Sequence, residues 1–208
     1  MAAWAGIIGP ALFVAVFTIE GRLRPGYEPL KMYVSALSLG LRGWIQMANF
    51  IILGILLFVF TRGVKAEFET GKASRGGLIL LTIIAILFIV SGPLRMDPMF
   101  TPANQVTVHG TIHGIAGAII FVLMPISCFV YLRRFRTDSE WQFLQWWTLA
   151  LGILTAIALV VFSVISKAPD LQNRFIDWLG FFQRTLIVPY MLWVFIFALG
   201  VLKNLKRR

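Results

Sequence analysis

Six long apolar runs, separated by short polar connections, constrain the fold of this chain more than any other feature. They cover residues 3–19, 44–60, 77–92, 112–132, 146–166 and 181–201. A bilayer core about 30 Å thick takes about 20 helical residues per crossing, and backbone groups in lipid must find their hydrogen bonds within the protein. The runs therefore predict an all-α polytopic membrane protein, a bundle of six transmembrane helices.

The composition agrees with a chain that is mostly inside the membrane. Of the 208 residues, 59% are hydrophobic and 13% are charged, whereas soluble domains average about 45–50% and about 25%. Six crossings use about 120 positions, so we expect residues 1–208 to form a single six-helix transmembrane domain. The first run lacks the basic leader and small-residue cleavage site of a secretory signal, and we expect it to be retained. Pro10, Pro125 and Pro189 fall inside the runs and predict local kinks.

Lysines and arginines lie at the ends of the apolar runs and give a formal net charge of +10. Membrane orientation and anionic head groups explain such residues, and no basic face interleaved with aromatic residues indicates a nucleic-acid partner. Of the 19 lysines and arginines, eleven lie on the side of the two termini. We therefore expect both termini in the cytoplasm, and the longer connections, residues 20–43 and 167–180, on the outer side. Residues 167–180 favour either a short helix in the interface plane or a loop with aromatic anchors.

Polar residues that membrane anchoring does not require gather on the predicted outer side. Ionisable groups at membrane depth cost roughly 2.5–3.5 kcal/mol each, so they normally face inward and pair. We therefore expect an outward-facing polar cavity, partly covered by residues 20–43. The residues expected around it are Arg24, Tyr27, Ser35, Ser38, Asp97, His109, His113, Gln183 and Arg184.

His109 and His113 are the only histidines, and a spacing of four places both on one helix face. With Asp97 as a third ligand they could hold zinc, which would activate a bound water. The alternative is a polar network of the same residues without a metal. We do not expect haem, because two axial histidines must face each other across the macrocycle. The single cysteine, Cys128, excludes an internal disulfide and cysteine-based metal sites.

Arg184 offers a planar guanidinium that suits a phosphate or carboxylate head group, and it could instead pair with Asp97. We expect Gln183, Arg24, Tyr27 and Ser38 to contribute to the same substrate-binding surface. Ser35 could act as a nucleophile if a histidine lies within hydrogen-bond reach, or it could serve as a local cap.

Several short motifs, taken in order, resemble one known family. They are Arg-Pro-Gly-Tyr-Glu-Pro-Leu at residues 24–30, Val-Ser-Ala-Leu-Ser-Leu-Gly at 34–40, Gly-Trp-Ile-Gln-Met-Ala-Asn-Phe at 43–50, Asp-Pro at 97–98, His-Gly-Thr-Ile-His-Gly at 109–114 and Phe-Gln-Arg at 182–184. Together they resemble the domain of unknown function 998 family of six-helix prokaryotic membrane proteins. The resemblance implies a compact six-helix bundle in a bacterial or archaeal cell membrane, and it implies no activity.

These observations leave several functions open. One is a hydrolase or transferase acting on a lipid or a lipid-linked substrate, with His109, His113, Asp97 and Ser35 as catalytic residues. Another is a non-catalytic protein that binds or transports an amphiphile through Arg184 and aromatic side chains. A third is an accessory subunit that packs against a partner in the membrane. In each case membrane lipid is the expected partner, and the site lies on the outer side.

Overall fold

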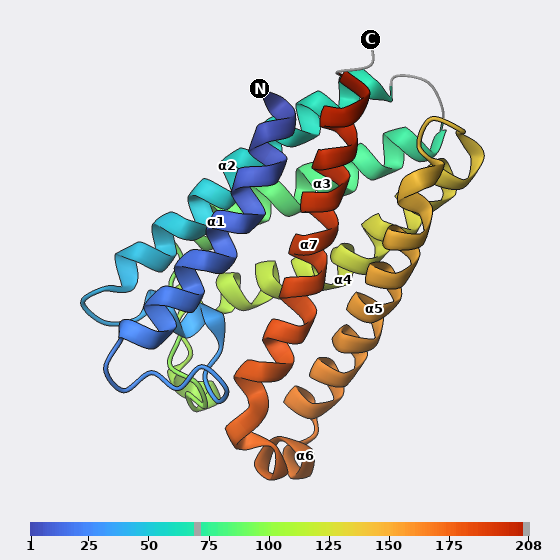
Figure 1. Cartoon of the computed structure of the whole chain (residues 1–208). Helices are drawn as coiled ribbons and strands as arrows, with labels where there is room; N and C mark the ends of the chain where they lie inside the picture. The colour runs from blue at the N-terminus through green and yellow to red at the C-terminus, as the bar shows by residue number, and fades with distance from the viewer. Residues whose placement is uncertain (69–71, 206–208) are drawn as a thin grey trace.

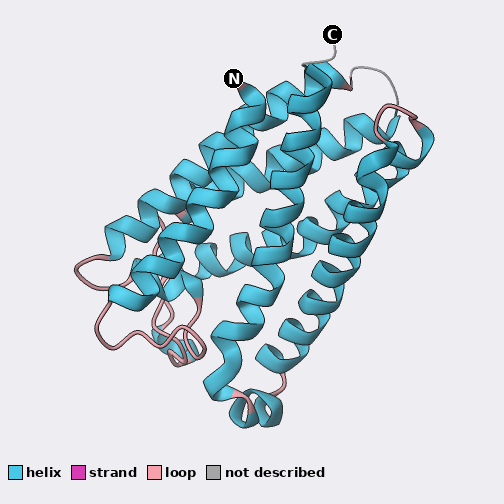
Figure 2. Ribbon diagram, in the orientation of Figure 1, coloured by secondary structure: helices cyan, strands magenta, loops and turns pink. Residues whose placement is uncertain are grey.

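The structure is a computed structural model that describes residues 1–68 and 72–205, without the side chains of residues 72–74. The long helices are α1 (Ala2–Leu23), α2 (Gly43–Glu67), α3 (Lys72–Ser91), α4 (Val108–Thr137), α5 (Gln145–Lys167) and α7 (Leu179–Leu205) (Figure 1). The connections hold a short helix, α6 (Pro169–Arg174), and the 3-10 turns η1 (Val34–Ser38), η2 (Ala103–Gln105), η3 (Gln142–Leu144) and η4 (Ile176–Trp178). Figure 2 shows no strand in the described part of the chain, so the all-α prediction is confirmed.

Within residues 1–68 and 72–205, five helices are long and apolar enough to cross a membrane. They are α1, α2, α4, the helical segment Gln142–Lys167 that contains α5, and the segment Ile176–Leu205 that contains α7. In α3, the segment Arg75–Ser91 is a shorter apolar helix. Every predicted run lies within one long helix, except that Gly92 falls just beyond α3. The predicted sixth crossing therefore depends on α3.

The long helices pack as a closed ring in the order α1, α2, α3, α4, α5, α7, and each packs against the two beside it. Such a ring leaves a central space that large side chains must fill, because protein interiors are close-packed. Aromatic rings fill it. In one half, Tyr131 and Phe135 of α4 contact Phe197 of α7, with ring centroids 4.8 and 5.1 Å apart. In the other half, Phe13 of α1 contacts Phe88 of α3.

The start of α1 and the end of α7 lie at the same end of the ring, as Figure 1 shows. The opposite end, here called the loop end, carries residues 24–42, 92–107 and 168–178. The last of these segments contains α6 and η4, so it is helical in part, which was one of its two predicted forms. Residues 69–71, in one predicted cytoplasmic connection, and 206–208, in the predicted basic tail, lie outside the described residues. The side of the membrane on which each end lies stays a prediction.

Residues 24–42 are fixed over the loop end by the start of α7. Free N–H groups at a helix start need acceptors, and here Gly180 N–H donates to Lys31 O (3.1 Å) and Phe181 N–H to Leu30 O (2.8 Å). The contact is so close that a Cβ at Gly180 would lie 2.3 Å from the carbonyl oxygen of Met32. At its far end the segment is held by an ion pair between Arg42 and the buried Glu20 of α1. The segment is therefore part of the fold rather than a loose loop.

Candidate functional site

A cavity of about 400 Å³ lies at the loop end, between η1, residues 96–106, and helices α4, α5 and α7. Its wall is mostly apolar, and the polar side chains in it are those of Tyr33, Ser35, Asp97, Thr101, His113 and Gln183. A smaller space of about 30 Å³ lies deeper and shares Ser35, His113, Gly117 and Phe121 with the first. Four residues predicted for the site, Ser35, Asp97, His113 and Gln183, therefore line one cavity.

The cavity reaches the outside of the helix bundle. Gly114 and Ala118 of α4 line it and are exposed, whereas His113 beside them is buried. A Cβ added at Gly114 or Gly117 would have no protein atom within 4 Å, so these glycines border open space. All of the lining residues on α4 lie in its first half. The opening is thus lateral, beside Phe162 of α5.

His113 is oriented by the end of α3. Its Nδ1 lies 2.7 Å from Leu94 O and 3.3 Å from Ser91 O. Carbonyl oxygens only accept hydrogen bonds, so Nδ1 is the donor and Nε2 of the neutral ring keeps its lone pair. The edge of the ring packs against Phe50, with centroids 5.8 Å apart. His113 therefore satisfies carbonyls at the end of α3 and retains one acceptor.

Asp97 is held by the start of α4. Its Oδ2 accepts from Thr107 N–H and its Oδ1 from Thr107 Oγ1, both at 2.9 Å. Thr107 is the N-cap of α4 and accepts from Gly110 N–H in turn. A carboxylate is favoured beside a helix N-terminus because the N–H groups there carry positive charge. Asp97 thus anchors residues 92–107 to α4, and it contributes to the cavity wall as a satisfied group.

The predicted zinc ligands His109, His113 and Asp97 are not brought together. Over residues 1–68 and 72–205, no three side chains of His, Cys, Asp and Glu form a group that could hold a metal ion. His109 is exposed and borders a separate hollow of about 380 Å³, together with Asp97 and Arg95. A spacing of four fixes only a shared helix face, and the bonds of His113 and Asp97 hold these two residues to different neighbours.

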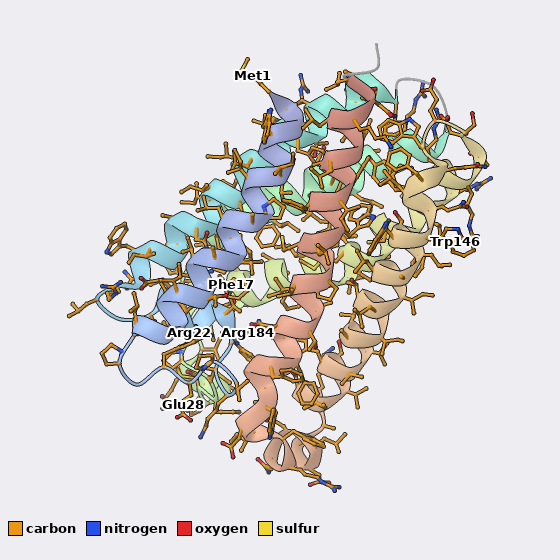
Figure 3. The ribbon with its side chains drawn as sticks, in the orientation of Figure 1. Met1, Phe17, Arg22, Glu28, Trp146 and Arg184 are labelled. Atoms are coloured by element: carbon orange, nitrogen blue, oxygen red, sulfur yellow. The ribbon has the colours of Figure 1, made fainter. Side chains whose placement is uncertain are left out.

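Arg184 donates hydrogen bonds to residues 24–42 and to α7 rather than to Asp97, and its binding of a head group stays a prediction. Its Nη1 donates to Met32 O (3.0 Å) and Gly180 O (2.9 Å), and its Nη2 donates to the Tyr27 hydroxyl. The guanidinium also lies 5.7 Å from the centroid of the Phe17 ring, and Figure 3 shows both residues in the half of the bundle near the loop end. Arg184 therefore fastens residues 24–42 to α7, and it is absent from the cavity wall as described.

Three other predicted binding residues also form hydrogen bonds within residues 24–42. Tyr27 donates to Tyr33 O (3.0 Å), Arg24 donates to Ala36 O (2.9 Å) and Ser38 donates to Ser35 O (2.7 Å). Burial raises the pKa of Tyr27, and the nearby Arg184 opposes this rise only in part, so the phenol stays protonated. These hydrogen bonds fix the conformation of residues 24–42, the segment that covers the cavity.

Gln183 is the predicted binding residue that does reach the cavity. Its Oε1 accepts from Val34 N–H at 2.7 Å, which positions η1 beside α7. An amide carries two donors besides its oxygen, so the NH₂ group of Gln183 supplies donors at the wall. Tyr33 also lines the cavity; its hydroxyl lies 3.5 Å from Ser166 Oγ, and burial raises its pKa.

Sequence reasoning missed the residues that form the opening. These are Gly114, Gly117 and Ala118 on α4, with Phe121 and Phe162 as aromatic walls. The spacing of Gly110, Gly114 and Gly117 along one side of α4 is the signal that could have found them, because it removes side chains from a continuous strip. The aromatic walls carry no comparable signal in a chain so rich in phenylalanine.

The family model described as protein of unknown function (DUF998) matches residues 7–200. Searches of the curated proteins and of the solved structures found no match.

Proposed function

Because the chain belongs to the DUF998 family, whose function is unknown, we propose its function from the cavity: the protein binds an amphiphilic ligand in the outer half of a cell membrane. The observation that carries this proposal is the composition of the cavity wall. Ser35, His113 and Gln183 provide hydrogen-bonding groups in a wall that is otherwise mostly aromatic and aliphatic. Such a wall suits a molecule with one polar group and an apolar chain.

The position of the cavity supports a ligand that arrives from the lipid phase. The opening at Gly114 and Ala118 lies on the outside of α4, where a transmembrane helix contacts lipid. The loop end carries fewer lysines and arginines than the end with the termini, which favours an outward-facing loop end. A lipid in the outer leaflet could then enter laterally without leaving the membrane.

A second candidate is an acyl hydrolase or transferase that uses Ser35 and His113. It is favoured by the hydrogen bond of His113 Nδ1 to Leu94 O, which leaves Nε2 able to accept the proton of a nucleophile. Ser35 lines both cavities with His113. A fluorophosphonate probe that labels wild-type protein and fails to label Ser35→Ala would support this candidate; wild-type protein that stays unlabelled would refute it.

Photo-crosslinking in phosphatidylcholine nanodiscs tests the binding proposal. The probes are oleyl lipids with a diazirine in the chain, and crosslinks are expected on α4 between Gly110 and Phe121 and at Phe162. Gly117→Leu should reduce labelling there about tenfold, because helical leucines point toward the helix start and the new side chain would lie in the cavity.

Gly76→Leu in α3 is the matched control, since a Cβ there meets only Val130, at 3.8 Å, and the site is outside the cavity. It should leave the labelling unchanged. If every probe labels Gly117→Leu as strongly as the wild type, the binding proposal is wrong.

A further inference from the structure

The charges around the cavity restrict which ligand it can take. Among the described residues that line it there is no lysine and no arginine, and Asp97 is the one charged side chain. An anionic head group would therefore enter without a cation to pair with, and an unpaired charge away from water is costly.

Four basic side chains near the loop end are engaged in other contacts, and Arg95 borders the separate hollow beside His109. Arg42 pairs with Glu20, Lys31 pairs with Asp177 at 3.1 Å, and Arg24 donates to a backbone carbonyl. Arg184 donates to Met32 O and to the Tyr27 hydroxyl, both within residues 24–42. Within the part of the chain that the structure describes, none of these five basic side chains lines the cavity.

Asp97 does not make the cavity a site for cations either. Both of its oxygens accept hydrogen bonds from Thr107, and it lies at the start of α4, where the helix dipole offsets its charge. The Cα of Gly110 also packs directly on the carboxylate, since a Cβ there would overlap Oδ2. The charge of Asp97 is thus partly offset by the start of α4, and both of its oxygens already have a hydrogen-bond donor.

The remaining polar groups match a hydroxyl. The Nε2 of His113 accepts a hydrogen bond, the NH₂ group of Gln183 donates, and Ser35 does both. A hydroxyl is itself donor and acceptor, so it can satisfy two of these groups at once. A volume of about 400 Å³ is near the lower end for small-molecule cavities, which suits one chain rather than two.

We propose that the ligand is a single-chain amphiphile with an uncharged hydroxyl head group, such as a long-chain alcohol or a monoacylglycerol; this rests on the binding function proposed above. The hydroxyl lies between His113 and Gln183, and the chain leaves past Gly114 along the outside of α4. Long-chain alcohols and monoacylglycerols share this chemistry and differ in what lies next to the hydroxyl.

The experiment compares three competitors with the same chain and different head groups. Oleyl alcohol, oleyl phosphate and oleyltrimethylammonium are titrated at pH 8 against a diazirine-labelled oleyl alcohol in nanodiscs containing the full chain. Oleyl alcohol should compete about tenfold better than either charged lipid, because only the charged head groups lose hydration without gaining a partner. Monooleoylglycerol, which has the same chain, is tested in parallel, and its competition relative to oleyl alcohol distinguishes the two sources of the hydroxyl.

A charge variant makes the inference independent of absolute affinity. Ala118 is exposed at the opening, so Ala118→Arg adds a cation without burying it. It should improve competition by oleyl phosphate several-fold, while Ala118→Gln leaves the order of the competitors unchanged. If a charged lipid competes as well as the alcohol on wild-type protein, and Gly117→Leu still blocks labelling, the hydroxyl inference is wrong and the binding function stands. If Gly117→Leu blocks no probe, the binding function itself fails.

Discussion

The contact between Gly110 and Asp97 gives the sharpest test of how the loop end is built. A Cβ at Gly110 would lie 2.0 Å from Asp97 Oδ2 and 3.0 Å from Asp97 N. The carboxylate cannot simply rotate away, because both oxygens are bonded to Thr107 and the backbone of Asp97 is close as well. Gly110→Ala should therefore break the link between residues 92–107 and α4.

The expected cost follows from two opposing effects. Hydrogen bonds to charged groups contribute about 1.5–3 kcal/mol each when buried, and the half-exposed Asp97 reduces this to about 1–3 kcal/mol for the pair. Replacing a helical glycine by alanine returns up to about 1 kcal/mol. We expect a net loss of about 1–2 kcal/mol in the free energy of unfolding, or about 2–8 °C in the thermal midpoint. Tryptophan fluorescence during heating of the protein in detergent measures this midpoint.

Two further variants separate this contact from a general effect of alanine. Gly114→Ala lies one turn further along α4, where a Cβ meets nothing within 4 Å, so it should leave the midpoint unchanged or raise it. In an Asp97→Ala background, Gly110→Ala should lose its cost. The reasoning is refuted if Gly110→Ala lowers the midpoint equally with and without Asp97, or if Gly114→Ala is as damaging.

The remaining predictions concern residues 24–42, the segment that covers the cavity, and the orientation of the protein in the membrane. Gly180→Ala should lower the thermal midpoint by more than Gly110→Ala, because its Cβ would lie 2.3 Å from a backbone carbonyl oxygen that cannot move alone; an unchanged midpoint would contradict the docking of residues 24–42. Arg184→Lys keeps the charge and loses the guanidinium fork, so we expect a midpoint about 2–4 °C lower, measured in the same way. Leu41→Cys, at a fully exposed position in the covering segment, should react with a membrane-impermeant maleimide on intact cells, whereas the buried Cys128 should not; labelling only after permeabilisation would reverse the predicted orientation.

The helices could be predicted from the sequence because lipid leaves the backbone little choice. An apolar run of membrane length must satisfy its own N–H and C=O groups, which makes it a helix wherever it packs. The helix ends are less determined. α4 continues to Thr137, five residues beyond the predicted end, since Arg134 and Asp138 pair at 2.8 Å and extend it into polar sequence. Such extensions depend on side-chain pairs that hydropathy does not register.

The site was harder to predict because residue spacing gives a helix face and not the group opposite that face. His113 lies on the expected side of α4, yet its partner is the carbonyl of Leu94 at the end of α3. Arg184 lies near the loop end as expected, but residues 24–42 fold across it and present carbonyl oxygens instead of Asp97. In both cases the partner is a backbone group, and its position depends on the tertiary fold.

Some of the polar residues expected around one cavity line it, and others form separate contacts elsewhere at the loop end. Glu20 is used by Arg42, Asp97 by Thr107, and Arg184 by the covering segment. Buried polar groups are normally satisfied within the fold, so most of them say nothing about a ligand. A functional site is better sought among polar groups that can still form hydrogen bonds once the contacts within the protein have been made. By that criterion the Nε2 of His113 and the NH₂ group of Gln183 are the groups to test, because each residue uses its other polar atom to hold a neighbouring segment and both line the same cavity.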